Sequence, residues 1–400
     1  MRLTDLATRL VAVGLMAAAI GQPASGIGLF DACDSDCDTA FCDNGICDIS
    51  SCDVEACDGI ATSRIRRGPV PGMFGDGGLL IPGANILTGG LQLIFQNHAY
   101  KVAENNSALP QDRIGFNFNA MQDVFNGQSD GRVDDDIYEY RLFGEKTFLD
   151  GRFSVDLMVP FYTTSTLEYD PLDAVTNGPG TEGSFGDLAF GFKALLHESC
   201  TSACSLGLRI EAPTGDEIVS PRSLNVFYRS FDDDVWHFTP YVASLWTPSD
   251  RTFIPSFLSY RFSSSSFKEV EQPLSNREQR YFMAAVSIGY WLYRNRCGSC
   301  LTGLAPMLEL HYTGAWDEES ASSQNVGLRN TVTNLIYGKS DRLNLTVGTT
   351  AFFGSRCSAG VAIAAPLRSN ETSPLGGATI DSDRAYDWAL LTQLTYYFGR

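Results

Sequence analysis

The feature that most constrains this chain is an alternation of apolar and polar residues that recurs from near residue 110 to the carboxyl terminus. The stretch 153–162 shows it clearly, because Phe153, Val155, Leu157, Val159 and Phe161 stand at every second position. A period of two is typical of a strand whose two faces meet different surroundings. No long window shows the 3.6-residue period of an amphipathic helix. The alternation therefore predicts an all-β fold.

Two all-β architectures contain many such strands, a soluble sandwich and a barrel that crosses a membrane. The predicted strands run for about 10 to 14 residues, longer than the roughly 5 to 6 of globular strands and long enough for a tilted membrane strand. Aromatic residues gather near strand ends, as at Trp291 and Tyr293, which is typical of interfacial girdles. Charged residues are 19% of the chain, below the usual level of about 25%. These observations favour an antiparallel transmembrane β-barrel over 105–400.

Short and long connections alternate along the predicted barrel, as in outer-membrane barrels with short periplasmic turns and long external loops. Counting back from a periplasmic carboxyl terminus gives about 12 strands, at 112–124, 137–149, 152–164, 184–197, 204–214, 235–247, 252–264, 279–294, 301–314, 343–353, 357–366 and 385–399. An even number is usual for single-chain bacterial barrels. Residues 88–104 also have a strand-like pattern, so 14 strands are the alternative.

The amino terminus has the plan of a secretory signal peptide. Arg2 and Arg9 precede an apolar run from Leu10 to Ile20, and small residues follow up to Gly26. The run is too short for a membrane helix, which needs about 20 residues. We expect residues 1–26 to direct export, which places the barrel in the outer membrane.

A Cys-Asp dipeptide recurs in residues 27–60, a segment with eight Asp, one Glu and neither Lys nor Arg, which holds half of the net charge of −18. The six cysteines, each followed by Asp, are Cys33, Cys37, Cys42, Cys47, Cys52 and Cys57. Such a short segment cannot build its own core. It is interpreted as a tether stapled by disulfides, as a site for a soft metal, or as a repeat with neither role. Residues 61–104 then form a linker, which the Gly and Pro residues within 61–78 indicate, and either a segment inside the lumen or an extra strand.

The other five cysteines all fall at predicted short turns: Cys200, Cys204, Cys297, Cys300 and Cys357. Short turns share one rim of a barrel, the periplasmic side from which the tether emerges. Because five is odd and six is even, one rim cysteine is predicted to pair with the tether. All eleven cysteines are therefore candidates for disulfides or metal binding.

Polar residues on the inner face of the predicted strands would line the lumen, because that face of an outer-membrane barrel is polar. The predicted pore-lining residues are Asp156, Lys193, Arg209, Glu211, Glu309 and His311. Charged side chains in a pore bias ion passage electrostatically. We expect these six to set a charge preference, and residues 79–104 to narrow the lumen.

Several short motifs resemble a family of bacterial outer-membrane β-barrels, transporters associated with the phenol-degradation meta pathway. They are Gly186-Asp187-Leu188 with Gly191 and Lys193, Glu211-Ala212-Pro213-Thr214-Gly215-Asp216, and the aromatic final strand. Two further stretches, 110–118 and 144–154, resemble a related envelope-barrel subgroup. The resemblance covers roughly 110–400 and implies a pore or uptake role.

The sequence thus favours a barrel that passes or binds small solutes within membrane lipid. The alternative is a structural protein whose segment 27–60 contacts another envelope protein. A hydrolase is the third hypothesis; its one candidate, Asp232 to Asp234 near His237, is interpreted as an acidic loop. We predict no enzyme activity and no cofactor. The acidic balance excludes nucleic acid as a partner.

Overall fold

The computed structural model describes residues 70–398 apart from several gaps, which are 88–89, 125–135, 168–178, 200, 216–217, 220–229, 233–234, 265–266, 270–274, 277–279, 296–299, 316–339, 369–370, 373–379 and 382. The predicted signal peptide and the Cys-Asp tether lie outside the described residues. Among the described residues, no helix is long and apolar enough to cross a membrane.

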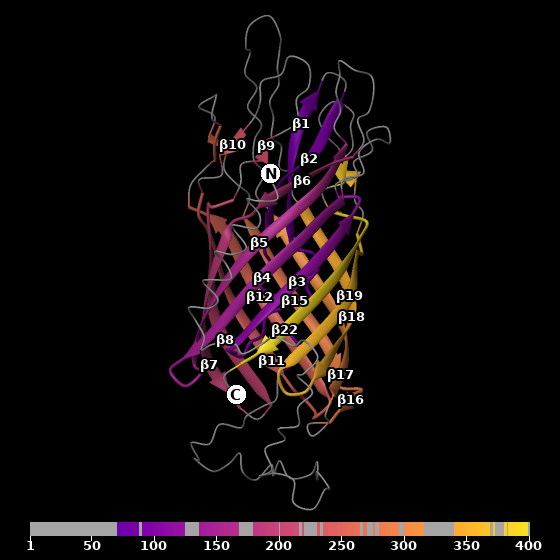
Figure 1. The fold of residues 1–400 in the computed structure, drawn as a ribbon. Helices are drawn as coiled ribbons and strands as arrows, with labels where there is room; N and C mark the ends of the chain where they lie inside the picture. The colour runs from indigo at the N-terminus through magenta and orange to yellow at the C-terminus, as the bar shows by residue number, and fades with distance from the viewer. Residues whose placement is uncertain are drawn as a thin grey trace, which may run out of the picture.

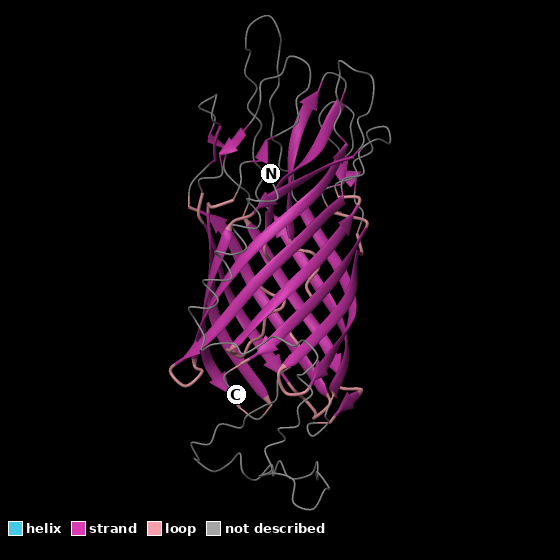
Figure 2. Ribbon diagram, in the orientation of Figure 1, coloured by secondary structure: helices cyan, strands magenta, loops and turns pink. Residues whose placement is uncertain are grey.

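Twelve long strands close into one antiparallel barrel (Figures 1 and 2). They are β3 (Arg113–Gln122), β4 (Asp136–Phe148), β5 (Phe153–Leu167), β7 (Leu188–Glu198), β8 (Ser202–Ala212), β11 (His237–Trp246), β12 (Thr252–Ser263), β15 (Tyr281–Tyr290), β17 (Leu301–Ala315), β18 (Ser340–Phe353), β19 (Cys357–Pro366) and β22 (Trp388–Tyr397). Each pairs with its neighbours in the chain, and β22 closes the ring on β3. Because no edge is left, every wall strand has partners on both sides. The predicted count of 12 is confirmed.

The remaining strands do not enlarge the ring. β1 (Leu79–Leu87) and β2 (Gly90–Ala99) pair only with each other, so the alternative count of 14 is wrong for the wall. β6 (Pro179–Phe185), which precedes β7, pairs with the part of β5 that β7 leaves free, and β16 (Tyr293–Arg294), which follows β15, pairs with β17 beyond β15. The short strands β9 (Ile218–Val219), β10 (Ser230–Asp232), β13 (Phe267–Glu269) and β14 (Ser275–Asn276) form a small sheet, and β20 (Glu371–Thr372) pairs with β21 (Ile380–Asp381).

Short turns join the strands at one end of the barrel, here called the short-turn rim, and the longer connections meet at the other end, the long-loop rim. The turn between β4 and β5, residues 149–152, is one example. Its residues Leu149, Asp150 and Gly151 all have positive φ, and Gly151 N donates to Phe148 O at 3.0 Å. The alternation predicted from the sequence is therefore present, and it distinguishes the two ends of the barrel.

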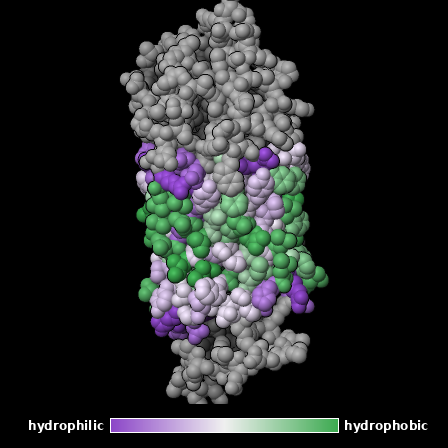
Figure 3. All heavy atoms as spheres, turned by 180° about the vertical axis from the view of Figure 1, so that it is seen from behind, coloured by the Kyte–Doolittle hydropathy of each residue, from purple (hydrophilic) through white to green (hydrophobic). Residues whose placement is uncertain are grey.

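The outer face of the wall is apolar. Its middle carries exposed aliphatic residues, among them Leu206, Val242, Val286, Leu308, Val347, Val361 and Ile363. Exposed aromatic residues lie toward both ends: Trp236, Tyr260 and Trp388 toward the long-loop rim, and Phe153, Trp246, Tyr290, Phe353 and Tyr396 toward the short-turn rim. Figure 3 shows the resulting hydrophobic band between two hydrophilic ends. A lipid-facing surface requires this order of residues.

Candidate functional site: a lumen filled by the chain itself

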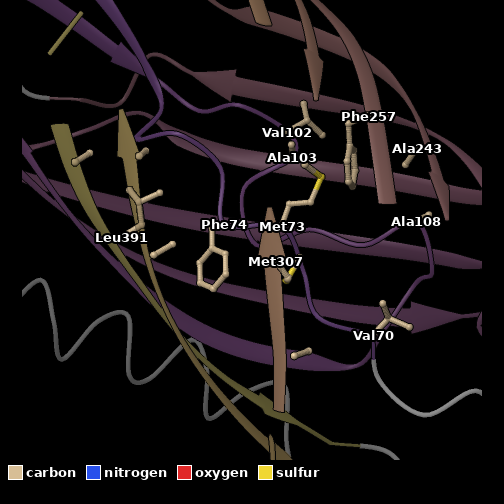
Figure 4. Packing of buried hydrophobic residues seen from close by; sticks show 14 of the residues in the cluster. Val70, Met73, Phe74, Val102, Ala103, Ala108, Ala243, Phe257, Met307 and Leu391 are labelled. Atoms are coloured by element: carbon tan, nitrogen blue, oxygen red, sulfur yellow. The ribbon is translucent and has the colours of Figure 1, made fainter. Parts of the chain in front are cut away.

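Two stretches that flank the β1–β2 hairpin lie inside the barrel, and we call residues 70–78 and 100–112 together the inner segment. Met73 and Phe74 are almost completely buried, in one apolar cluster with Phe257, Met307 and Leu391 of the wall (Figure 4). The sequence assigns 61–78 to a linker because of their Gly and Pro content. The structure places the part of that stretch that it describes, 70–78, within the lumen.

The inner segment crosses the lumen in both directions. At the end of the first crossing, Leu79 packs with Tyr281 and Ala315, which stand at the long-loop ends of β15 and β17. At the end of the second crossing, Asp112 accepts hydrogen bonds from Thr147 N at 2.6 Å and Thr147 Oγ1 at 2.8 Å, near the short-turn rim. A backbone bridge between Met73 and Glu104 joins the two crossings. The first crossing therefore ends toward the long-loop rim, and the second ends at the short-turn rim.

Phe74 is seated where the wall has glycines. A Cβ added to Gly348 of β18 would lie 2.6 Å from the ring, and one added to Gly360 of β19 would lie 2.7 Å from it. Separations under 3.0 Å essentially never occur for a real Cβ. The two glycines thus leave the space that the aromatic ring fills.

Glu309 holds the backbone beside that ring. Its carboxylate accepts hydrogen bonds from Phe74 N at 2.9 Å and Gly75 N at 3.0 Å, and His311 Nε2 lies 2.9 Å from the same group. Gly75 has φ +87°, and a Cβ there would lie 2.3 Å from Glu104 Cγ. Only glycine fits this left-handed, close-packed position. Glu309 is fully buried and is therefore a wall anchor for the first crossing.

Further ion pairs join the inner segment to the wall and its two crossings to each other. Lys101 Nζ lies 2.6 Å from Asp76 Oδ2, which also accepts a hydrogen bond from Asn344 Nδ2 at 2.7 Å. Glu104 pairs with Arg141 of β4, whose guanidinium lies 5.1 Å from the centre of the Tyr100 ring. Buried charges of this kind are tolerated because each has an opposite charge in contact.

The second crossing meets a hub at Glu145 of β4. The Glu145 carboxylate accepts from Arg113 Nε at 2.8 Å, Lys193 Nζ at 2.9 Å and Ser154 Oγ at 2.7 Å. Lys193 Nζ also donates to Asn106 Oδ1 of the inner segment at 2.9 Å. The hub therefore links three wall strands beyond β4 to the inner segment.

All six residues predicted to line the lumen stand on the inner face of the wall and are buried: Asp156, Lys193, Arg209, Glu211, Glu309 and His311. Lys193 and Glu309 contact the inner segment directly, as described above. The other contacts are within the wall: Arg209 Nη2 lies 3.4 Å from Asp156 Oδ1, and Glu211 accepts from Arg261. That these residues line an open pore stays a prediction.

Sequence reasoning missed other inward-facing charges, namely Arg113, Glu139, Arg141, Glu145, Arg261 and Arg342. The alternation could have identified Arg141, because it lies on the same face of a predicted strand as Glu139 and Phe143. The charged residues of the inner segment carry no such signal, since they follow no strand alternation.

The cysteines within the described residues lie at the short-turn rim. Cys204 and Cys357 stand near the start of β8 and β19, and Cys300 directly precedes β17. The other eight lie outside the described residues, so the disulfide and metal hypotheses stay predictions. Among the residues that the structure describes, no group of three or more His, Cys, Asp or Glu could hold a metal ion.

Two of the motifs that resemble the barrel family, 186–188 and 211–216, contact each other at the long-loop rim. Asp187 Oδ1 accepts hydrogen bonds from Gly215 N at 2.9 Å and Thr214 N at 3.1 Å, and Leu188 N donates to Thr214 Oγ1 at 2.9 Å. Burial raises the pKa of Asp187 above its ordinary value, although the two backbone N–H groups act in the opposite direction. These hydrogen bonds hold the two motifs together at the long-loop rim.

The structure describes only part of the candidate site for hydrolysis, which consists of Asp232 to Asp234 and His237. His237 is buried on the inner face, and its Nδ1 lies 4.0 Å from Glu211 Oε2. Asp233 and Asp234 lie outside the described residues.

No family model matches the chain, and no curated protein matches it. Similar solved structures include an outer membrane channel from Pseudomonas putida F1, 13% identical over 73% of this chain and 97% of the channel, with a TM-score of 0.49. The KdgM porin is 10% identical over 72% of this chain and 99% of its own, with a TM-score of 0.34. LpxR from Salmonella typhimurium is 8% identical over 72% and 100%, with a TM-score of 0.39. The barrel assignment itself rests on the strand pairing.

Proposed function

We propose that this chain is an outer-membrane β-barrel that passes or binds small solutes, with its own inner segment controlling the lumen. The apolar belt between two aromatic girdles supports insertion in a lipid bilayer. The observation that most supports the proposed function is the buried charge on the inner face of the wall. Its wall presents buried charges whose partners include the inner segment, as Glu309 and Arg141 do, instead of a continuous apolar core.

The inner segment is held by hydrogen bonds and ion pairs that can break and form again. A hydrogen bond to a charged group contributes about 1.5–3 kcal/mol. Anchors such as the two backbone donors on Glu309 are therefore strong enough to seat the inner segment and weak enough to be exchanged for water. Withdrawal would leave a polar wall that water can hydrate.

Conductance of the purified full chain in a planar bilayer tests this function. We expect ion conductance that rises in Glu309→Ala, because that substitution removes the acceptor for Phe74 N and Gly75 N. The matched control is Glu198→Ala, the same chemical change at an exposed position near the short-turn rim. A channel that is silent in both the wild type and Glu309→Ala would refute the solute-passing role.

One observation favours the structural alternative as well. Lys193 and Glu309 of the inner face bond directly to the inner segment, and the second crossing ends near the short-turn rim. A permanently closed barrel would still present residues 27–60 to another envelope protein at that rim. Silence in the conductance experiment, with a folded barrel shown by heat-modifiable gel mobility, is the result that this alternative predicts.

A further inference from the structure

Cationic side chains outnumber carboxylates on the inner face toward the long-loop rim. This holds for the described wall residues that lie at most five positions from the long-loop end of their strand, as Arg141 lies from Asp136. The cations are Arg141, Lys193, Arg209, Arg261 and Arg342, and the carboxylates are Glu139 and Glu211. A solute entering from that rim therefore meets a positively charged stretch of wall.

Arg141, Lys193, Arg209 and Arg261 each have a carboxylate oxygen within 3.4 Å, and the contact of Arg209 is the longest of the four. Arg261 donates to Glu211 Oε2 from Nε at 3.2 Å and from Nη2 at 3.0 Å. Arg209 is 3% exposed, and Asp156 Oδ1 accepts from its Nη2 at 3.4 Å. Among the residues that the structure describes, its Nε and Nη1 have no hydrogen-bond partner. Buried donors are almost always satisfied, so two open donors on one guanidinium indicate a missing acceptor.

The surroundings of Arg209 fit such an acceptor. Thr239 is its register partner on β11, and the buried Thr239 Oγ1 likewise has no hydrogen-bond partner in the described part of the chain. On the other side its register partner is Gly191 of β7, where a Cβ would lie 1.9 Å from Asp156 Oδ2. The absent side chain lets Asp156 reach across β7 toward one edge of the guanidinium, while the remaining nitrogens stay open.

We propose that Arg209 and Thr239 form a binding position for the oxyanion group of a small solute, a carboxylate or a phosphate. This rests on the proposed function and names the class of solute that the lumen takes. Arg209 supplies charge-assisted donors, which suit planar carboxylates and phosphates. Thr239 supplies a hydroxyl that donates to the same oxyanion. The pair stands near the long-loop end of β8 and β11, where an incoming anion would first meet the wall.

The test is the charge preference of the purified full chain in a planar bilayer under a KCl gradient. We expect a reversal potential on the anion-selective side in the wild type. Arg209→Gln should reduce the ratio of chloride to potassium permeability by about twofold or more, because a fixed charge on the wall biases ion passage. Arg209→Lys keeps the charge and should keep most of the preference. Arg152→Gln, the same change at an exposed short turn, is the matched control.

A second measurement uses inorganic phosphate as the probe and chloride current as the readout. Phosphate should block the wild type, and Arg209→Gln should need about tenfold more phosphate, as expected when a charge-assisted contact is lost. Thr239→Val, which changes no charge, should weaken the block to a smaller degree and keeps the test valid if Arg209→Gln does not fold. Conductance without anion preference, or a block unchanged in the folded variants, overturns the binding position alone. A channel that never conducts overturns the proposed function together with it.

Discussion

The fit between Phe74 and Gly360 gives the sharpest test of how the inner segment is seated. A Cβ on Gly360 would lie 2.7 Å from Cε1 and 3.0 Å from Cζ of the ring, and Phe74 is only 1% exposed. The next atom, Thr350 Oγ1, is 3.1 Å away, so the ring is the main obstacle. Gly360→Ala should therefore lower the free energy of unfolding by about 1–3 kcal/mol, the usual cost of overpacking.

A double-mutant cycle isolates that contact. Phe74→Ala alone should cost about 3–5 kcal/mol, as for other buried Phe side chains. In that background the added methyl group has space, so Gly360→Ala should be almost neutral, with a coupling energy of about 1–3 kcal/mol. Urea unfolding of the purified protein in lipid vesicles, followed by tryptophan fluorescence, measures all four free energies.

Gly144→Ala is the matched control in β4, because the nearest atom to a Cβ there is Arg113 O at 3.9 Å. We expect that change to stay within about 0.5 kcal/mol. If the costs of Gly360→Ala and Phe74→Ala simply add, Phe74 does not lie against Gly360 and the seating described above is wrong.

Three further predictions concern the hub, the belt and the long-loop rim. Glu145→Gln removes a carboxylate shared by two buried cations and should lower the free energy of unfolding in urea by about 3–5 kcal/mol. Lys146→Gln, in a half-exposed pair, should change it by about 0–1 kcal/mol. Equal effects of the two substitutions would contradict the role of Glu145 as a hub. Val361→Lys places a charge in the lipid-facing belt and should cost about 2–4 kcal/mol in vesicle refolding, and a neutral result would argue against a membrane environment. Because burial raises the pKa of Asp187 above 3.8, the folded rim binds that proton more tightly than the unfolded chain, so stability falls as pH rises from 3.8 through the raised pKa. Asp187→Asn should remove this step from a pH series of unfolding midpoints, and its persistence would refute the assignment.

The wall was predictable because a period of two and the length of each segment are local properties of the sequence. Strand β5 illustrates this, since its alternation from Phe153 to Phe161 fixes which residues face lipid and which face the lumen. The same parity placed Asp156 and Glu309 on the inner face. Alternating connection lengths then gave the strand count and distinguished the two rims.

The filling of the lumen was not predictable in the same way. Residues 70–78 have the Gly and Pro content of a linker, and their burial depends on partners far away in the sequence. Phe74 meets Gly348, and Gly75 N meets Glu309, across more than 200 residues. No local pattern encodes such contacts, because they arise only when the ring of strands has closed around the segment.

Amide hydrogen exchange of the purified full chain, read by mass spectrometry, tests the filled lumen most directly. Peptides covering 70–78 and 100–112 should exchange slowly, because Phe74 N and Gly75 N are bonded to Glu309 inside the barrel. In Glu309→Ala the 70–78 peptide should exchange faster while peptides of β5 and β8 stay protected. Fast exchange of both inner peptides in the wild type, beside protected wall strands, would show that the inner segment does not fill the lumen.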